Sequence, residues 1–359
     1  MSAMSAGPIT GYVLKLARES AALSQDATAE LLHVDAGTVQ GWESGRRHFG
    51  AVSFRQALTV RRKLTAAGAN STLIRLVDVA NTADQVVEEL IIAPPERHKL
   101  ADFALSALVM TNEVSQLLSW LLSSREPPII SQNRKQIRRR GPVAKAPALT
   151  AAERVSAFAN LDVIADRAAR RSELSLLHRQ ARFLSGFGSP SHGGLTSFEA
   201  REFGRVVRQS GWSSRWPQAR SIAMHQARHG DPELLQKFIT HAYGDVSCTL
   251  AELNYSAYWV GELQAQFSDD TFMANGCLEW SGERLRNHLA ERLKPDHYLA
   301  ALSINTLASL RTAKPWLFVS SLITFPLLVS VEMLLDAECL DSFSHHQAEL
   351  FRRALLESK

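Results

Sequence analysis

Residues 24–47 read S-Q-D-A-T-A-E-L-L-H-V-D-A-G-T-V-Q-G-W-E-S-G-R-R and predict two short helices joined by a tight turn. Ser24 is a typical N-cap residue, because its side-chain oxygen can accept a hydrogen bond from a backbone N–H in the first helical turn. Ala27, Leu31 and Leu32 follow at helical spacing. Helices this short cannot bury a core alone, so flanking helices must complete the unit.

The second predicted helix follows the break H-V-D at residues 33–35. Asp35 can cap it, and its spacing turns Val39 and Trp42 inward. Gly45 ends it, since a glycine just past the end of a helix adopts the left-handed conformation without steric cost.

Residues 12–64 resemble the helix-turn-helix domain of the lambda-repressor-like family, also called Cro/C1 or XRE. The patterns L-x-x-A-R-E-S-A-A-L-S-Q, A-E-L-L-x-V and T-V-Q-G-W-E-S-G-R-R match that family without a gap across the two central helices. Long actinobacterial regulators with such an N-terminus look similar in outline. The resemblance covers roughly a seventh of the 359 residues and implies a sequence-specific, DNA-binding transcriptional regulator.

In such domains the second helix of the motif enters the major groove, with its N-terminal residues facing base edges. The resemblance therefore assigns DNA contacts to Ser24, Gln25, Ala36, Gly37, Thr38, Gln40, Gly41, Arg46 and Arg47. Gln25 would hold a phosphate at the start of the preceding helix. Arg46, Arg47 and His48 would grip the sugar-phosphate backbone.

The predicted reading helix carries few groups that can recognise bases. Ala36, Gly37 and Gly41 have no hydrogen-bonding side chains, which leaves Thr38 and Gln40. We therefore expect backbone contacts, DNA shape or paired half-sites to supply the remaining specificity.

The same resemblance places Arg18 and Glu43 as a buried ion pair that ties the first helix to the third. The alternative is two solvated charges. His33 stands where the family often has glycine, and a left-handed conformation is uncommon for a histidine.

Composition and periodicity predict an all-α protein, since Ala, Leu, Arg and Glu are frequent and β-branched runs are few. We expect a helix-turn-helix domain at residues 10–68, a helical extension at 69–125 suited to dimerisation, and a helical C-terminal domain at 150–359. That last domain would be a bundle or an irregular solenoid, with sensory or interaction roles. Within it, Thr150 and Glu153 have the spacing of a capping box and open a helix with Val155, Phe158 and Leu161. In the helix-turn-helix domain, Ser53 caps a further predicted helix, with Phe54, Ala57, Leu58 and Leu64 at helical spacing.

Residues 126–149, E-P-P-I-I-S-Q-N-R-K-Q-I-R-R-R-G-P-V-A-K-A-P-A-L, predict an exposed basic linker. Residues 1–150 hold 18 Lys and Arg against 13 Asp and Glu, whereas residues 151–359 hold 22 against 23. The excess of positive charge therefore lies in residues 1–150, which contain the predicted helix-turn-helix, where a polyanion such as DNA would bind.

Three widely spaced cysteines, Cys248, Cys277 and Cys339, show no metal-binding or disulfide pattern and are typical of a reducing cytoplasm. The N-terminus lacks the basic and apolar regions of a signal peptide. His225 and His229 are four positions apart, a spacing at which two histidines on one helical face can bind the same metal ion. The glutamate that the H-E-x-x-H protease motif requires is absent between them. We therefore expect no cofactor and no metal.

The segment 316–335, W-L-F-V-S-S-L-I-T-F-P-L-L-V-S-V-E-M-L-L, is about as long as a membrane span. Pro326 lies at its middle and Glu332 near its end. A buried helix, kinked or broken at Pro326, is the better prediction, so no membrane partner is expected.

Tyr255, Tyr258, Trp259 and Glu262 share one helical face. They could line a small-molecule pocket, and core packing explains them equally well.

The sequence thus favours a cytoplasmic, non-enzymatic, homodimeric regulator of double-stranded DNA, open to a small-molecule or protein effector. No nucleophile, dinucleotide or paired-carboxylate motif stands out. Two alternatives remain open: an architectural or plasmid- and phage-maintenance DNA-binding protein, and an enzyme that its helix-turn-helix delivers to DNA.

Overall fold

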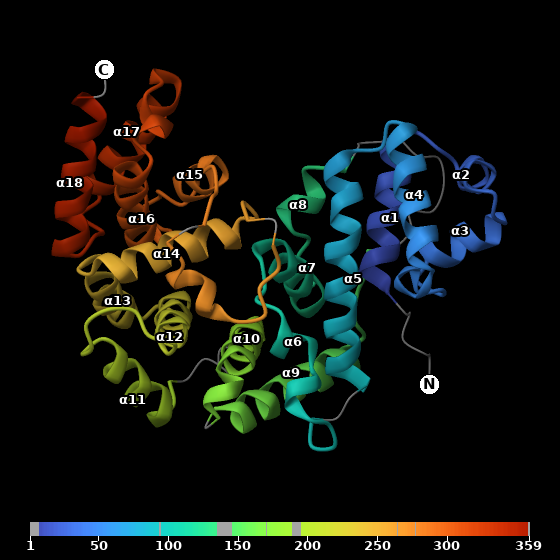
Figure 1. The fold of residues 1–359 in the computed structure, drawn as a ribbon, viewed down its shortest axis with the longest axis horizontal. Helices are drawn as coiled ribbons and strands as arrows, with labels where there is room; N and C mark the ends of the chain where they lie inside the picture. The colour runs from blue at the N-terminus through green and yellow to red at the C-terminus, as the bar shows by residue number, and fades with distance from the viewer. Residues whose placement is uncertain are drawn as a thin grey trace. The chain divides into compact units, whose positions relative to one another are not determined.

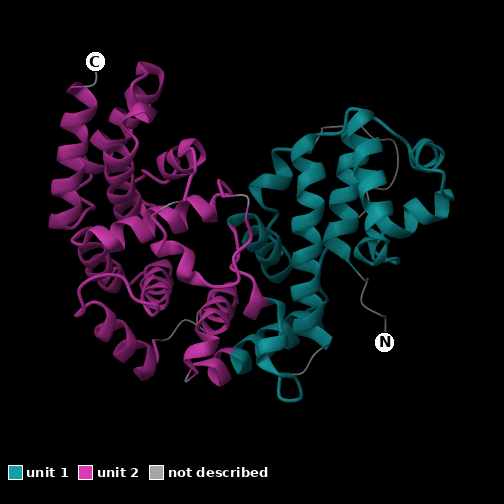
Figure 2. Ribbon diagram, viewed as in Figure 1, with its two compact units in different colours: residues 1–104, 112–164 teal, residues 105–111, 165–359 magenta. Residues whose placement is uncertain are grey.

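The computed structural model describes residues 7–92, 95–134, 146–169, 171–188, 195–263, 265–276 and 278–357. Within these ranges the chain forms 18 α-helices, joined by turns and short 3-10 helices, and no strand (Figure 1). The prediction of an all-α protein is confirmed. Two compact units are present: unit 1 holds residues 1–104 and 112–164, and unit 2 holds residues 105–111 and 165–359 (Figure 2).

The first nine helices lie wholly or partly in unit 1: α1 Pro8–Ser20, α2 Gln25–Leu32, α3 Ala36–Glu43, α4 Phe54–Ala66, α5 Ser71–Ile92, α6 Ala104–Ala107, α7 Asn112–Ser123, α8 Pro128–Ser131 and α9 Ala151–Ala168. Residues 105–107 of α6 and 165–168 of α9 already belong to unit 2. Short 3-10 helices lie at Phe49–Ala51 and Leu100–Asp102. The described parts of the predicted linker, 126–134 and 146–149, belong to unit 1, and residues 135–145 with their arginines lie outside the described residues.

Side-chain caps begin several of these helices where the sequence predicts them. The side chains of Ser24 and Ser53 accept hydrogen bonds from the N–H groups of Ala27 and Gln56. Thr150 and Glu153 form the reciprocal hydrogen bonds of a capping box ahead of α9. These hydrogen bonds confirm the predicted caps. The caps could be predicted from the sequence because each depends on residues only three positions apart.

Helix α1 is the centre of unit 1, since every residue from Ile9 to Arg18 is buried. It packs on both α3 and α5, so it has no solvated face of the ordinary amphipathic kind. Tyr12 makes an edge-on ring contact with Trp120 of α7 at 5.4 Å, and its hydroxyl accepts a hydrogen bond from Arg134 at 2.8 Å.

Two apolar side chains expected on inner faces lie in solvent instead. Phe54 is the first residue of α4 and is 79% exposed, and Val155 is the fifth residue of α9 and is 70% exposed. Helical spacing shows which residues share a side of a helix, but the contacts with other helices decide which side is buried.

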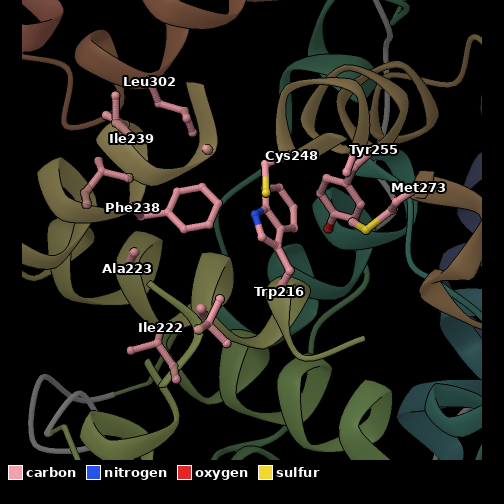
Figure 3. Close-up of a cluster of buried hydrophobic side chains, with 14 of the residues drawn as sticks. Trp216, Ile222, Ala223, Phe238, Ile239, Cys248, Tyr255, Met273 and Leu302 are labelled. Carbon is pink, nitrogen blue, oxygen red and sulfur yellow. The ribbon is translucent and has the colours of Figure 1, made fainter. Parts of the chain in front are cut away.

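Unit 2 contains α10 Ser175–Ser185, α11 Ser197–Val206, α12 Trp216–Arg228, α13 Glu233–Tyr243, α14 Val246–Trp259, α15 Glu283–Ala290, α16 Ala300–Ala313, α17 Ser321–Asp336 and α18 Ser342–Glu357. Among the described residues of this unit, 3-10 helices lie at Ser172–Leu174, Asp270–Ala274 and Pro315–Phe318. One core cluster gathers around Trp216 and Phe238, whose rings lie 4.9 Å apart (Figure 3). A second cluster joins α15 to α18.

The apolar segment 316–335 becomes a 3-10 turn followed by α17. Helix α17 runs through Pro326 without a break, and Leu327, Val331 and Leu334 face the core. Only part of the segment is buried as predicted, because Leu322 and Phe325 are exposed. Within the described ranges, no helix combines the length and the apolar character needed to cross a membrane.

A bidentate ion pair lies inside unit 2. Arg220 donates from Nε and Nη2 to the two carboxylate oxygens of Glu252, each at 2.7 Å, and the Glu252 side chain is fully buried. The guanidinium also lies over the Tyr255 ring, 4.5 Å from its centroid. This geometry is the one in which a buried pair offsets the cost of removing both charges from water.

We predict that Glu252→Ala lowers the free energy of unfolding by about 3–5 kcal/mol, because Arg220 stays buried without its counter-charge. The matched control is Glu233→Ala, which removes the acid of the exposed Lys237–Glu233 pair and should cost at most about 1 kcal/mol. Urea denaturation of the two variants measures the difference. Equal costs would contradict this account of the buried pair.

His288 is a half-buried base that the fold keeps neutral. Burial, aided by the charge of Arg292, lowers the pKa of His288 to about 3. In the unfolded chain a histidine titrates near pH 6.5, so between these pH values the unfolded state binds the extra proton. This contribution to stability is complete above pH 6.5 and is lost as the pH falls toward 3.

We predict that wild type loses about 2 kcal/mol more stability than His288→Gln between pH 7 and pH 5. The control is His346→Gln, since His346 is exposed and should follow wild type. Urea denaturation at the two pH values measures the effect. Parallel pH profiles for wild type and His288→Gln would refute it.

Candidate nucleic-acid interface

Helices α2 and α3 are joined by the three residues 33–35. His33 has φ 56° and ψ 49°, the left-handed conformation expected at this position of the turn. Gly45, with φ 70°, follows the end of α3 as predicted. Asp35 is the N-cap residue of α3, but its side chain forms no capping hydrogen bond, so the turn is held by backbone bonds instead.

One carboxylate, that of Glu43, joins the first three helices. Arg18 of α1 donates to it from Nε at 2.5 Å and from Nη2 at 3.0 Å, and Gln25 of α2 donates from Nε2 at 2.7 Å. The side chains of Arg18 and Glu43 are 9% and 3% exposed. The predicted ion pair is therefore present and buried, and it sets the position of α3 relative to α1 and α2.

Close backbone approach provides a second link between α1 and α3. A Cβ atom added at Gly11 would lie 2.3 Å from the carbonyl oxygen of Trp42, so no larger residue fits without moving a helix. The indole of Trp42 is buried and makes an edge-on contact with Phe49 at 5.4 Å.

Helix α1 is held at its own N-terminus by Asp84 of α5. The Asp84 carboxylate accepts hydrogen bonds from the N–H of Ile9 at 3.0 Å and from the N–H and hydroxyl of Thr10 at 2.8 and 2.6 Å. Burial raises the pKa of Asp84, and these hydrogen bonds oppose the rise. Sequence reasoning missed this residue, because a cap supplied from 74 positions away leaves no local pattern.

The outer surface of α3 is open. Ala36, Gly37 and Gln40 are exposed, and a Cβ atom at Gly37 would meet nothing within 4 Å. Thr38 is half-buried. This surface is bounded by small side chains, so a partner could approach the α3 backbone closely.

Two exposed arginines follow α3 and fold back along it. Arg47 donates from Nη1 to the Thr38 hydroxyl at 3.0 Å, and Arg46 donates from Nη2 to the side-chain amide oxygen Oε1 of Gln40 at 3.4 Å. Gly41, predicted on the exposed face, is buried, because the Arg47 side chain covers it. The structure thus brings together the two base-reading candidates and the two backbone-binding candidates.

Three other predicted contacts have different surroundings. The Gln25 side chain, predicted to hold a phosphate, donates to Glu43 and positions α3. Ser24 accepts from the N–H of Ala27, which removes that group from phosphate binding. His48 is half-buried, with its ring against Gly7 and Gly50 instead of the predicted phosphate surface.

The aromatic face on α14 is packed into unit 2. Tyr255 and Tyr258 are buried, and the Tyr258 hydroxyl donates to the carbonyl of Val109 at 2.6 Å. Trp259 stacks on Tyr255 at 6.3 Å, and Glu262 accepts the N–H of Leu285 at 3.0 Å in the first turn of α15. These contacts favour core packing over a ligand pocket, which stays an untested prediction.

The rings of His225 and His229 lie 4.7 Å apart. Across the described ranges, however, no three His, Cys, Asp or Glu side chains form a group that could hold a metal ion. Cys248 and Cys339 are free thiols, and Cys277 lies outside the described residues.

Comparisons with protein-family models, with curated proteins and with solved structures find no match to this chain. The geometry of α1–α3 is therefore the basis for any functional assignment.

We predict that Glu43→Ala lowers the free energy of unfolding by about 3 kcal/mol, because Arg18 stays buried and its remaining ion pair, with Glu19, is longer at 3.4 Å. The control is Glu30→Ala on the exposed face of α2, which should change stability by at most about 0.5 kcal/mol. Urea denaturation followed by circular dichroism measures both. If Glu43→Ala matches Glu30→Ala, the three helices do not depend on this carboxylate.

Proposed function

We propose that unit 1 contains a lambda-repressor-like helix-turn-helix domain and that the protein regulates transcription by binding duplex DNA. Helix α3 enters the major groove in this proposal. The observation that carries it is the α2–α3 pair, which Glu43 holds at a set angle while α3 keeps an open outer surface flanked by Arg46 and Arg47.

The small residues on α3 suit a helix that must lie deep in the groove. With Ala36 and Gly37 at its start, the α3 backbone can approach base edges without steric conflict. Gln40 would form a bidentate contact with adenine, which supplies about 1–3 kcal/mol of discrimination. Thr38 would contact a thymine methyl group.

Arg46 and Arg47 would have different hydrogen-bond partners in the free protein and in the DNA complex. In the free protein they satisfy Thr38 and Gln40. On DNA, phosphate oxygens are stronger partners for a guanidinium than a neutral hydroxyl or amide is, so Arg46 and Arg47 would turn outward. Both reading side chains would then be released toward the bases.

A single interface of this kind reads few bases, so we propose that two copies bind a two-part site. Unit 2 would then serve oligomerisation or signal input, including a response to a small-molecule or protein effector. The bare reading face also favours a second candidate, an architectural DNA-binding protein, because only two side chains on α3 can discriminate bases. Genome-wide binding separates the two candidates: sharp promoter peaks indicate a regulator, and broad coverage indicates an architectural role.

We predict that the double variant Gln40→Ala, Arg46→Ala binds its selected duplex at least about 10-fold more weakly than wild type. It should also lower the slope of log K against log salt by about 1, since one phosphate contact is lost. Fluorescence anisotropy of the full chain, with duplexes selected from a random pool, measures both quantities.

The matched control is Gln236→Ala, Arg201→Ala, which removes the same two residue types from exposed positions of unit 2. It should bind as wild type does. The proposal fails if wild type retains no duplex at low salt, or if the two double variants bind DNA equally.

A further inference from the structure

The part of unit 2 that includes α17 carries an unusual uncharged run. Residues 315–331, P-W-L-F-V-S-S-L-I-T-F-P-L-L-V-S-V, contain no Asp, Glu, Lys or Arg. Helix α17 packs on α18 (Figure 1). Its buried residues Leu327, Leu328, Val331 and Leu334 belong to the second core cluster. The solvent-facing side of a surface helix is normally polar in a monomer.

The outer side of α17 is apolar instead. Leu322, Phe325, Val329 and Met333 follow one another at helical spacing and are between 42% and 86% exposed. In the turn just before the helix, Trp316 and Val319 are 62% and 68% exposed. These six residues are called the α17 face below.

The extent of the α17 face matches one side of a dimer interface. At these exposed fractions the six side chains present on the order of 500 Å² of apolar surface. A standard interface buries about 800 Å² per partner, of which about 65% is apolar in homodimers. A patch of this size exceeds what isolated surface hydrophobic residues explain.

Charge indicates which partner fits. The exposed charges on α17 itself, Glu332 and Asp336, are both acidic, whereas a helix that lies on lipid carries Lys and Arg along its polar side. Each of these two acids lies seven positions after a residue of the α17 face, at the C-terminal end of the same helix side. An antiparallel two-fold contact places the acidic ends of the two helices at opposite ends of the interface, so like charges stay apart. Both observations favour a second copy of this chain over a membrane.

We propose that two copies of the chain pair through their α17 faces, with the two α17 helices antiparallel about a two-fold axis. The stripe is close to symmetric about residues 327 and 328, so Phe325 of one copy would pack on Val329 of the second copy. Leu322 would pack on Met333 of the second copy in the same way. The antiparallel direction also brings Lys314, which precedes α17, toward the acidic end of the second copy's helix.

This pairing adds to the proposed function a surface through which two copies would associate. Only the role of the dimer on a two-part DNA site rests on the proposed function. Self-association itself depends on unit 2 alone. Failure of DNA binding with an intact dimer would therefore refute the proposed function and leave the pairing standing.

The test is analytical ultracentrifugation of the full chain from about 1 to about 100 µM, the range in which a standard interface of modest affinity dissociates. Wild type should be a dimer at the upper end. Phe325→Asp should weaken dimerisation at least about 30-fold, because it places two carboxylates in the centre of the contact. Val246→Asp is the matched control, since Val246 is 88% exposed on α14, outside the α17 face.

A charge exchange tests the antiparallel geometry. Phe325→Lys and Val329→Glu should each be monomeric alone, and mixing them should restore a dimer, because position 325 of one copy meets position 329 of the other. The proposal is overturned if wild type stays monomeric, if Phe325→Asp dimerises as Val246→Asp does, or if monomeric wild type binds phosphatidylserine vesicles through this face. Dimerisation of the mixture alone, with the two single variants monomeric, supports it.

Discussion

The position of the candidate reading helix depends on one buried carboxylate. Glu43 ends α3 and accepts hydrogen bonds from Arg18 of α1 and Gln25 of α2, so three helices converge on two oxygen atoms. Helices of eight residues, such as α2 and α3, bury too little apolar surface to define their own orientation. Charge-assisted hydrogen bonds add direction to that packing, because they weaken steeply when donor and acceptor move apart.

Helix α1 carries this arrangement into the rest of unit 1. Asp84 of α5 holds its N-terminus, and Gly11 lets α3 approach within backbone contact. The motif is therefore supported from two sides by groups that are buried in unit 1. In the proposed function this rigidity matters because α3 offers few base-reading side chains, and shape and backbone contacts demand an accurately placed helix.

Unit 2 inverts the usual distribution of polar and apolar groups at two places. The Arg220–Glu252 pair lies in the interior, and the α17 face lies in solvent. The first is compatible with folding because its geometry is bidentate and Glu252 is fully enclosed. The second is the surface that the proposed pairing of two copies would cover, in the unit that carries no part of the reading helix.

The sequence by itself determined the all-α class, the α2–turn–α3 pattern, the caps at Ser24 and Ser53, and the left-handed Gly45. Each depends on neighbours within about four positions, where helical geometry is local. The ion pair Arg18–Glu43 was predictable only through the resemblance of residues 12–64 to a known family. Tertiary structure alone decided that Gln25 supports Glu43, that Arg47 covers Gly41, that Asp84 caps α1, and that one side of α17 stays exposed. Those outcomes depend on which helices meet, and contacts between segments distant in the chain leave no periodic signal in it.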